Sequence, residues 1–412
     1  MFAIALGVRL LALTVLPEMT ITPDLEEYRY LAHAIAQRGE YAFREDWRDN
    51  PVLRGSPWWF YYDKTGMVRP PGYPVMIAGI ESTFGRNDRV LQYSLATLDA
   101  LTAVLVCRIA AILFSSGVGA VAGLLYAFNP NALQSINLRA REPLLVLLVS
   151  LAVLTLLKTA RNTRPQHAGA SGLLWAIATM VKETVGVMTV IAALWLAWRG
   201  TFQKAAVRTA VMVLVPSAVL ITPWLARNAL TVGQLTGIST LAGAGMWAGL
   251  VDDGLIFGYG LRLTPHFSDM DRVRLDPYTA GSAVEADRRL IGLVWKYTVI
   301  HPTEVSRQLL ANMLLFWSPV SRTVIMRGFE GRRLELLSLL YFSAIFLLAA
   351  AGLYFDRGRS EGRLSLTILA LTTLTHAPFY PTVRYRLQIE MFVTPYAAAA
   401  LYMLVTRFAS RR

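Results

Sequence analysis

The sequence is poor in charged residues and in cysteine. Only 16% of its 412 residues are charged and 55% are hydrophobic, whereas charged residues make up about a quarter of a soluble globular domain. This balance excludes a soluble globular protein and predicts an integral membrane protein. The single cysteine, Cys107, lies in an apolar run, so an internal disulfide framework is also excluded.

Metal-binding motifs and nucleic-acid-binding patterns are also lacking. The five histidines are scattered without the close spacing of zinc motifs, and Asp252 and Asp253 alone are a weak signal. We therefore expect no cofactor, and a divalent cation has no support from a motif. The formal net charge of +13 forms no basic stripe on a soluble domain, so we expect no nucleic-acid partner. The absence of an internal repeat gives no support to an inverted-repeat transporter.

Apolar runs predict an all-α, polytopic membrane protein. A helix needs about 20 apolar residues to cross the hydrocarbon core. We expect about ten transmembrane helices, eight of them over single runs and two from a hairpin within 169–198. The single runs are 2–16, 91–114, 118–136, 143–157, 205–225, 334–355, 364–379 and 389–406.

The hairpin follows from the basic residues on either side of 169–198. Lys158 and Arg161 precede this stretch and Lys204 and Arg208 follow it, and the positive-inside rule places both groups in the cytoplasm. Each arm has only about 14 residues, so the turn should lie below the outer membrane surface. That turn carries Lys182 and Glu183.

With ten helices, both termini are cytoplasmic and two long segments lie outside. We expect a transmembrane core over 1–226 that includes an outer loop at 17–89, an outer region over 227–333, and C-terminal transmembrane helices over 334–412. In the outer region, the apolar spacing within 305–316 predicts a helix that lies on the membrane.

The first outer loop begins with an amphipathic helix over 23–38. Thr22 is a candidate N-cap and Gly39 a C-terminal stop. An apolar stripe predicts that this helix lies in the membrane interface with Asp24, Glu27 and Arg38 in water. Asp24 is either an acid/base group or a first-turn acid that complements the helix dipole. The stripe consists of Leu25, Tyr28, Leu31, Ala32 and Ile35.

A rigid Arg-Pro-Pro-Gly-Tyr-Pro segment precedes a second, shorter apolar stretch in this loop. The segment spans Arg69 to Pro74 and includes Tyr73, and the following run over 75–84 is too short to cross the membrane. We expect a second interfacial helix there.

Charged residues gather at the outer ends of the predicted helices, where an unpaired charge is costly and therefore a functional candidate. Arg139 and Arg141 either extend to lipid head groups or bind a ligand, and Lys182 and Glu183 either pair with each other or line a pocket. Converging cations on one face favour an anionic head group as ligand. The candidates are Arg139, Arg141, Glu142, Lys182, Glu183, Arg227, Arg384 and Arg386.

Arg384 and Arg386 flank Tyr385 between two predicted helices. If this segment is extended, residues two apart point to the same side. Both guanidinium groups would then face one phosphate, which such groups bind in a bidentate manner.

These residues resemble, in layout and order, the C-type glycosyltransferase (GT-C) superfamily. The resemblance is to the bacterial branch related to protein O-mannosyltransferases and the aminoarabinose transferases of lipid A. It rests on Asp24 with Tyr28, Ala32 and Gly39, on Pro70 to Pro74, on Arg141 with Glu142, on Lys182, and on Arg384 to Arg386.

The resemblance implies an inverting transfer of a hexosyl or pentosyl unit from a polyprenyl-phosphate donor to a hydroxyl of a lipid, glycan or protein. It implies a location in the bacterial plasma membrane with the site on the periplasmic side. Asp24 would be the general base, with Glu26 and Glu27 as acceptor or secondary acids, although Leu25 separates them from Asp24. The donor phosphate would bind Arg384, Arg386, Lys182, Arg139, Arg141 and Arg227, with Tyr28, Arg69, Tyr73, Glu142, Glu183 and Tyr385 nearby.

Two other functions share this topology and remain open at this point. A transporter or flippase of an anionic lipid or solute would also need outer cations, and so would an oligosaccharide polymerase or ligase. Asp24 on an interfacial helix favours the enzyme, because a transporter has little use for an acid outside the bilayer.

Overall fold

A computed structural model describes residues 1–16, 22–56, 61–162, 164–251, 282–320, 333–380 and 382–409. Over these residues the regular structure is entirely helical, which confirms the predicted all-α class. Asp252, Asp253 and His266 lie outside the described residues.

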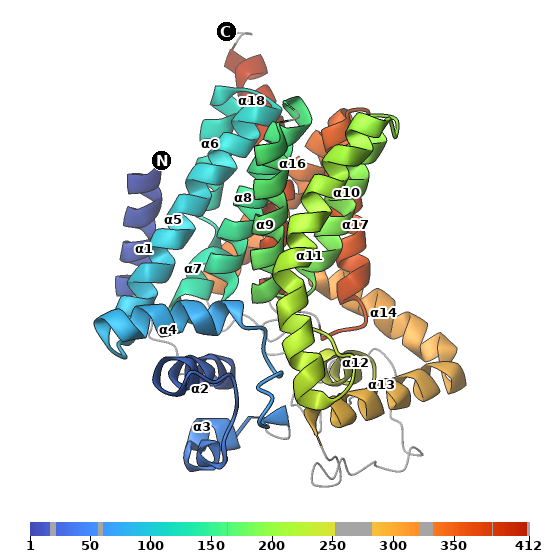
Figure 1. Ribbon diagram of the computed structural model, residues 1–412. Helices are drawn as coiled ribbons and strands as arrows, with labels where there is room; N and C mark the ends of the chain where they lie inside the picture. Colours follow the sequence, from blue (N-terminus) through green and yellow to red (C-terminus); the bar gives the residue numbers. More distant parts are fainter. Residues whose placement is uncertain are drawn as a thin grey trace.

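The fold has a bundle of roughly parallel helices and a layer of short helices across one end (Figure 1). The bundle helices are α1 (Phe2–Val15), α5 (Asp88–Leu113), α6 (Ser116–Ala127), α8 (Glu142–Arg161), α9 (Pro165–Val181), α10 (Val185–Arg199), α11 (Lys204–Val232), α16 (Arg333–Asp356), α17 (Ser360–His376) and α18 (Thr394–Ala409). Helices α5, α8, α11 and α16 are each long and apolar enough to cross a membrane. A 3-10 helix, η4 (Val383–Phe392), forms a bent apolar pair with α18 at 58°.

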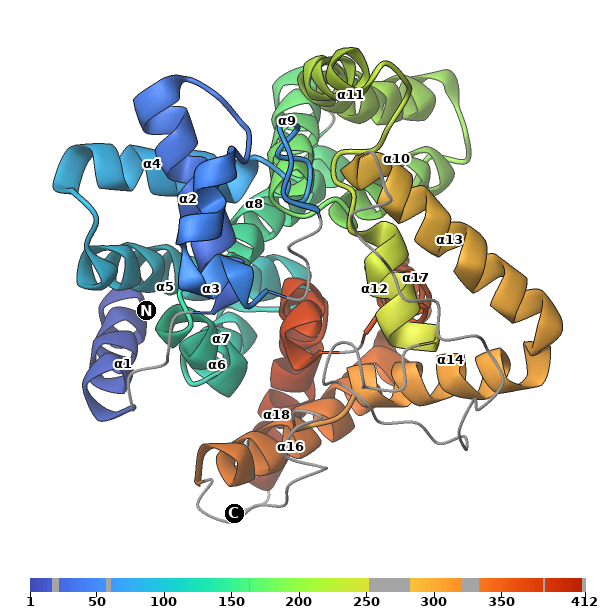
Figure 2. The same ribbon diagram turned by 90° about the horizontal axis from the view of Figure 1, so that it is seen from below.

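Figure 2 shows the end layer from below, with its N-terminal helices on one side and its later helices on the other. Figure 1 shows the N-terminus and α18 directed toward the opposite end of the bundle. The layer is formed by η1 (Glu45–Asp49), α2 (Pro23–Arg38), α3 (Pro51–Arg54), α4 (Gly72–Phe84), α12 (Ala242–Leu250), α13 (Ala283–Ile300) and α14 (Pro302–Phe316).

The structure contains the predicted hairpin and a helix at each of the three positions where an interfacial helix was predicted. Helices α9 and α10 fold back at Lys182 and Glu183. Helix α2 begins where expected, because the Thr22 side chain accepts a hydrogen bond from Leu25 N, and it ends at Gly39 in the left-handed conformation. Helices α4 and α14 occupy the other two predicted positions.

The single helix expected over 118–136 is wrong, because the chain breaks there into α6 and α7 (Pro130–Asn137). Asn129 ends the run by capping α7, with its side chain accepting hydrogen bonds from Asn131 N and Ala132 N at 2.9 and 3.2 Å. Pro130 then occupies the first helical position, where its missing N–H costs nothing.

A buried ion pair fixes α1 to the bundle. Arg9 contacts Asp99 of α5 at 2.6 Å, and both side chains are fully buried. Arg9 also donates to Ala127 O at 2.7 Å, while Tyr126 donates its hydroxyl hydrogen to Asp99 at 2.8 Å. These hydrogen bonds compensate Arg9 and Asp99 for the water contacts that both side chains lose on burial.

We expect Arg9→Met to lower the free energy of unfolding by about 3 to 5 kcal/mol, because it leaves Asp99 buried without its cation. Thermal melting in detergent measures this loss. The double variant Arg9→Met, Asp99→Leu should recover most of the stability, and a double variant as unstable as the single one would contradict the explanation.

Candidate functional site

A cavity of about 320 Å³ lies between the end layer and the bundle. Four cations and two carboxylates line it, so its wall carries an excess of positive charge. Apolar and small side chains from α12 and from the segment before η4 form the remaining wall. The lining includes Asp24, Arg69, Arg141, Lys182, Glu183, Thr184, Ser239, Ala242, Gly245, Phe379, Tyr380, Thr382, Arg384 and Tyr385.

Asp24, in the first turn of α2, lies between two arginines at this cavity. Its two carboxylate oxygens accept hydrogen bonds from Arg69 at 2.5 Å and from Arg384 at 3.2 Å. The side chain remains 35% exposed. The structure therefore brings together the proposed base, the Arg-Pro-Pro segment and η4, which are far apart in the sequence.

The charge state of Asp24 follows from these neighbours. Burial alone would raise the pKa of its carboxyl group, but attraction by Arg69, Arg384 and Arg141 outweighs burial and holds the pKa well below its usual range. Asp24 is thus ionised at neutral pH.

Glu27 was predicted to face water, and this is wrong, because its side chain is fully buried. Its carboxylate accepts hydrogen bonds from Arg69 and Tyr62, both at 2.5 Å, and from Ser56 at 3.0 Å. Burial raises the pKa of Glu27, and the attraction of Arg69 only partly offsets that effect. Glu27 therefore fixes the position of Arg69, which in turn donates a hydrogen bond to Asp24.

Lys182 ends α9 and contributes an ammonium group to the cavity. Its side chain is 96% buried, and Nζ lies 4.0 Å from the centre of the Tyr385 ring, a cation–π contact. Burial, together with repulsion from Arg141 and Arg384, lowers the pKa of Lys182 to about 7. Lys182 is therefore a cation whose charge depends on pH near neutrality.

Arg141 and Glu183 complete the polar wall. Arg141 donates to Val181 O at 3.3 Å and lines both this cavity and a smaller space of about 20 Å³ beside Asp24. Glu142 and Tyr28 line only that smaller space. Glu183 accepts a hydrogen bond from Ser239 at 3.1 Å, and so ties the hairpin turn to the segment before α12.

Arg386 does not face the cavity, contrary to the predicted pairing with Arg384. The segment forms the 3-10 helix η4 and is not extended, so residues two apart point in different directions. Arg386 is fully buried, and donates to Phe316 O and Ser318 O at 2.9 and 2.8 Å. It joins η4 to the end of α14.

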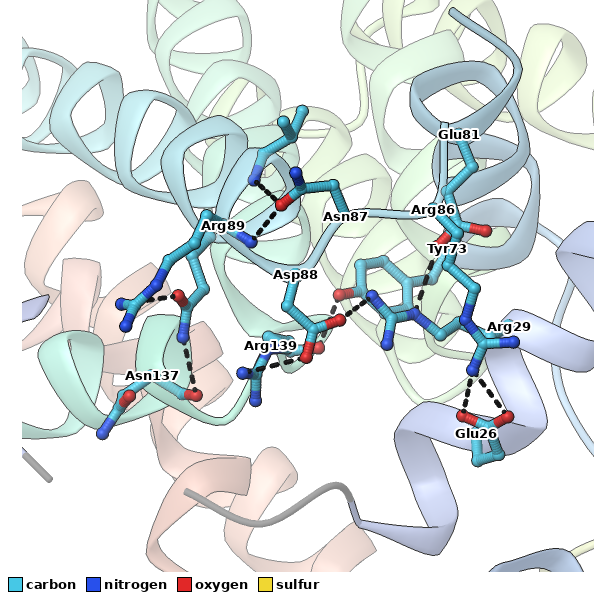
Figure 3. Close-up of polar contacts among 12 residues, drawn as sticks. Glu26, Arg29, Tyr73, Glu81, Arg86, Asn87, Asp88, Arg89, Asn137 and Arg139 are labelled. Atoms are coloured by element: carbon cyan, nitrogen blue, oxygen red, sulfur yellow. Dashed lines mark hydrogen bonds and ion pairs between the residues drawn. The ribbon is translucent and has the colours of Figure 1, made fainter. Parts of the chain in front are cut away.

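Arg139 is likewise engaged elsewhere. It is 2% exposed and lies 3.0 Å from Asp88, and Figure 3 shows the two side chains facing each other at the start of α5. Arg139 contributes to the wall of the small space beside Asp24. Its guanidinium group, however, forms an ion pair with Asp88.

Arg227 and Glu26 also serve the packing of the end layer. Arg227 donates to Thr65 O and Tyr41 O at 2.6 and 2.7 Å, which holds the segment between α2 and α4 on α11. Glu26 pairs with Arg86 at 2.9 Å, on the α4 side of α2 (Figure 3). Of the predicted phosphate ligands, Arg384, Lys182 and Arg141 are the ones that line the 320 Å³ cavity.

Tyr28 and Tyr73, two of the three tyrosines predicted for the site, differ in their roles. Tyr28 packs its ring 5.1 Å from the Arg69 guanidinium and lines the small space beside Asp24. Tyr73 is fully buried and donates its hydroxyl hydrogen to Arg139 O at 2.6 Å. Tyr28 thus belongs to the site, and Tyr73 to its support.

Several site residues lie at positions that the sequence did not single out. Ser239, Thr382 and Phe379 line the cavity, and Ser56 and Tyr62 hold Glu27. No spacing in the sequence links these residues to Asp24. Over the described ranges, no group of three or more His, Cys, Asp or Glu side chains could hold a metal ion.

Comparison with known proteins identifies the architecture. Residues 68–226 match the family model described as dolichyl-phosphate-mannose-protein mannosyltransferase. The oligosaccharyltransferase of Archaeoglobus fulgidus in the apo form is similar over 98% of this chain, with a TM-score of 0.56 and 14% identity. The chain has the GT-C glycosyltransferase fold. A search of curated protein sequences gave no significant match.

Two further solved structures are similar to this chain. AglB from Archaeoglobus fulgidus, in complex with an inhibitory peptide and a dolichol-phosphate, matches 98% of this chain with a TM-score of 0.54 and 13% identity. ArnT from Cupriavidus metallidurans, bound to undecaprenyl phosphate, matches 97% of this chain and 76% of its own length with a TM-score of 0.43 and 13% identity. This chain spans 50% of the length of each oligosaccharyltransferase.

Proposed function

We propose that this GT-C protein transfers a sugar from a polyprenyl-phosphate donor to an acceptor hydroxyl, with inversion at the anomeric carbon. The observation that carries the proposal is Asp24, an ionised carboxylate bonded to Arg69 and Arg384 on the wall of a cationic cavity at the end of the bundle. The family model and the dolichol-phosphate named for AglB support a lipid-phosphate donor.

The residues suit the bond changes of such a transfer. The acceptor oxygen attacks the anomeric carbon, the bond from that carbon to the phosphate oxygen breaks, and Asp24 takes the proton of the hydroxyl group. Negative charge grows on the departing phosphate, where Arg384, Arg141 and Lys182 stabilise it. Inversion needs one carboxylate on the acceptor side, and Asp24 supplies it.

Arg384 contacts the proposed base, Asp24, and also lines the cavity where the donor phosphate would bind. It is 27% exposed and its bond to Asp24 is 3.2 Å long, whereas Arg69 is more deeply buried and bound to both Asp24 and Glu27 at 2.5 Å. An arriving phosphate can therefore take Arg384 from Asp24 while Arg69 stays in place. Loss of that contact would raise the pKa of Asp24 and make it a better base at the moment of transfer.

We place the cavity at the outer face of a bacterial plasma membrane. The basic residues Lys158, Arg161, Arg199 and Lys204 lie at the ends of α8, α10 and α11 away from the end layer. By the positive-inside rule that side is cytoplasmic.

The test is a transfer assay with the purified full chain in lipid vesicles. Polyprenyl-phosphate-linked hexoses and pentoses are supplied with lipid, glycan and peptide acceptors, and release of polyprenyl phosphate is measured. Release together with a glycosylated acceptor is expected. Movement of the intact donor between leaflets without bond cleavage would instead show a flippase and would overturn the proposal.

The lowered pKa of Lys182 predicts that donor binding depends on pH. Below about pH 7 the ammonium group is charged and attracts the phosphate, and above that value the neutral amine does not. Affinity should therefore fall as pH rises through this range, by up to about tenfold per pH unit for one linked proton. The probe is a polyprenyl phosphodiester, whose own charge is constant in this range, measured by equilibrium binding between pH 6 and 8.

Lys182→Met is the matched variant for this measurement, because it keeps the buried chain length but removes the titrating group. Its binding should be weaker than wild type at pH 6 and nearly independent of pH. A wild-type affinity that does not change between pH 6 and 8 would contradict a phosphate contact by a Lys182 ammonium group that titrates near pH 7.

A further inference from the structure

One carboxylate joins the helix that carries Asp24 to the loop that carries Arg141. Asp88, in the first turn of α5, contacts Arg29 of α2 at 2.5 Å and Arg139 of the α7–α8 connection at 3.0 Å. Both arginine side chains are 98% buried. Figure 3 shows Asp88 between the two guanidinium groups.

Arg139 has a backbone conformation that needs support. Its φ of +54° lies in the left-handed region, which is uncommon and costly for a residue with a Cβ atom. Such a conformation persists only where surrounding contacts hold it. Here the fully buried Tyr73 donates its hydroxyl hydrogen to Arg139 O at 2.6 Å, and Asp88 holds the guanidinium group.

We call the cluster of Arg29, Asp88 and Arg139 the junction. Its two arginines are close in sequence to residues that line the cavity. Arg29 lies little more than one helical turn after Asp24 on α2, and Arg141 follows Arg139 by two residues. We propose that Asp88 and Tyr73 are positioning residues that hold Arg139 and thereby fix Asp24 relative to Arg141. This inference rests on the proposed function, because it assigns the junction a role in aligning base and donor.

A misalignment of reacting groups by about 1 Å can cost a hundredfold in rate. Loosening the junction should therefore lower kcat. Donor binding should change less than kcat, because Arg141 is the only one of the three proposed phosphate cations that lies beside Arg139, while Arg384 and Lys182 reach the cavity from η4 and from the end of α9. A purely structural role would lower stability without this separation of kcat from donor affinity.

The chain offers a matched control in Glu81 of α4, which also pairs with Arg29, at 3.1 Å. Glu81→Gln removes a comparable ion pair from α2 but leaves Asp88 bound to Arg139. Asp88→Asn removes the charge that holds both arginines, and Tyr73→Phe removes only the hydroxyl group that holds Arg139 O. The three variants keep the shapes of the side chains.

The experiment measures kcat, donor affinity and melting temperature for the full chain and these variants, with hydrogen exchange of the segments 22–38 and 136–142. We expect Asp88→Asn and Tyr73→Phe to lose about tenfold or more in kcat, with a clearly smaller loss of donor affinity. Asp88→Glu should recover part of the loss. Glu81→Gln should keep kcat near wild type even if it melts at a temperature as low as that of Asp88→Asn.

The exchange measurement separates failure of this inference from failure of the proposed function. Asp88→Asn should speed exchange in both segments, whereas Glu81→Gln should affect only 22–38. An active wild-type chain in which Asp88→Asn and Glu81→Gln have equal kcat would overturn the positioning role, and so would unchanged exchange in 136–142. A wild-type chain that transfers no sugar would overturn the proposed function, while the exchange pattern still decides whether Asp88 joins the two segments.

Discussion

Replacement of Asp24 by Asn should abolish sugar transfer while the protein still folds and binds its donor. The Asn side chain keeps the size of Asp24 but cannot accept the proton of the attacking hydroxyl group. Loss of a general base costs about a hundredfold to ten-thousandfold in rate. The side chain is 35% exposed, and Arg69 keeps its second bond to Glu27. We therefore expect only a small change in melting temperature.

Donor affinity distinguishes a lost base from a damaged site. Removal of a negative charge beside Arg384 should leave binding of a polyprenyl phosphodiester equal to wild type or tighter. Single-turnover transfer and equilibrium binding, measured on the same preparation, test the two expectations. The control is Glu26→Gln on the same helix, because Glu26 contacts Arg86 and Asn50 on the other side of α2.

Transfer by Asp24→Asn within a few-fold of wild type would remove Asp24 as the base. Equal losses in Asp24→Asn and Glu26→Gln would point instead to a general disturbance of α2, since these two residues share a helix but not a cavity.

The sequence allowed the helix pattern to be predicted because membrane crossing imposes strong local constraints. Apolar length, basic loops and end signals such as Thr22 and Gly39 are properties of neighbouring residues, and the structure confirms the helices that they indicated. Asn129 and Pro130 are also typical helix-start signals, but they lie within an apolar run long enough to be taken for one helix, so the break was not predicted.

The directions of side chains could not be predicted in the same way. Arg384 and Arg386 are equivalent in the sequence, and only the 3-10 geometry of η4 sends one to the cavity and the other to Phe316 O. Glu27 likewise occupies a position that a helical wheel assigns to water, yet the rest of the outer loop covers it with Tyr62 and Ser56. Such choices depend on contacts between segments far apart in the chain.

The electrostatic properties of the site come from the same long-range contacts. An aspartate in the first turn of a helix is ordinary in a sequence. Only the approach of Arg69, 45 residues later, and of Arg384, 360 residues later, makes Asp24 part of a charged cluster. The resemblance placed Arg69 and Arg384 in the same site as Asp24, but their contacts with its carboxylate could be known only from the fold.

Replacement of Arg384 by Ala should weaken binding of a polyprenyl phosphodiester by about 2 kcal/mol or more, roughly thirtyfold, because a charge-assisted hydrogen bond to the phosphate is lost. Arg384 lines the cavity at 27% exposure and already binds a carboxylate, which shows that its guanidinium group reaches an anion there. Arg384→Lys keeps the charge but not the bidentate geometry, so its affinity should lie between those of wild type and Arg384→Ala.

The control for this loss is Arg288→Ala. Arg288 is an exposed cation of α13 that contacts Gln234 and Leu235 O and does not line the cavity. Its removal changes the net charge of the end-layer side by the same amount, so an effect of general electrostatic attraction would appear in both variants and would fade with added salt. A direct phosphate contact would make the loss specific to Arg384 and largely retained at high salt. Equal, salt-sensitive losses in the two variants would exclude Arg384 from the phosphate site.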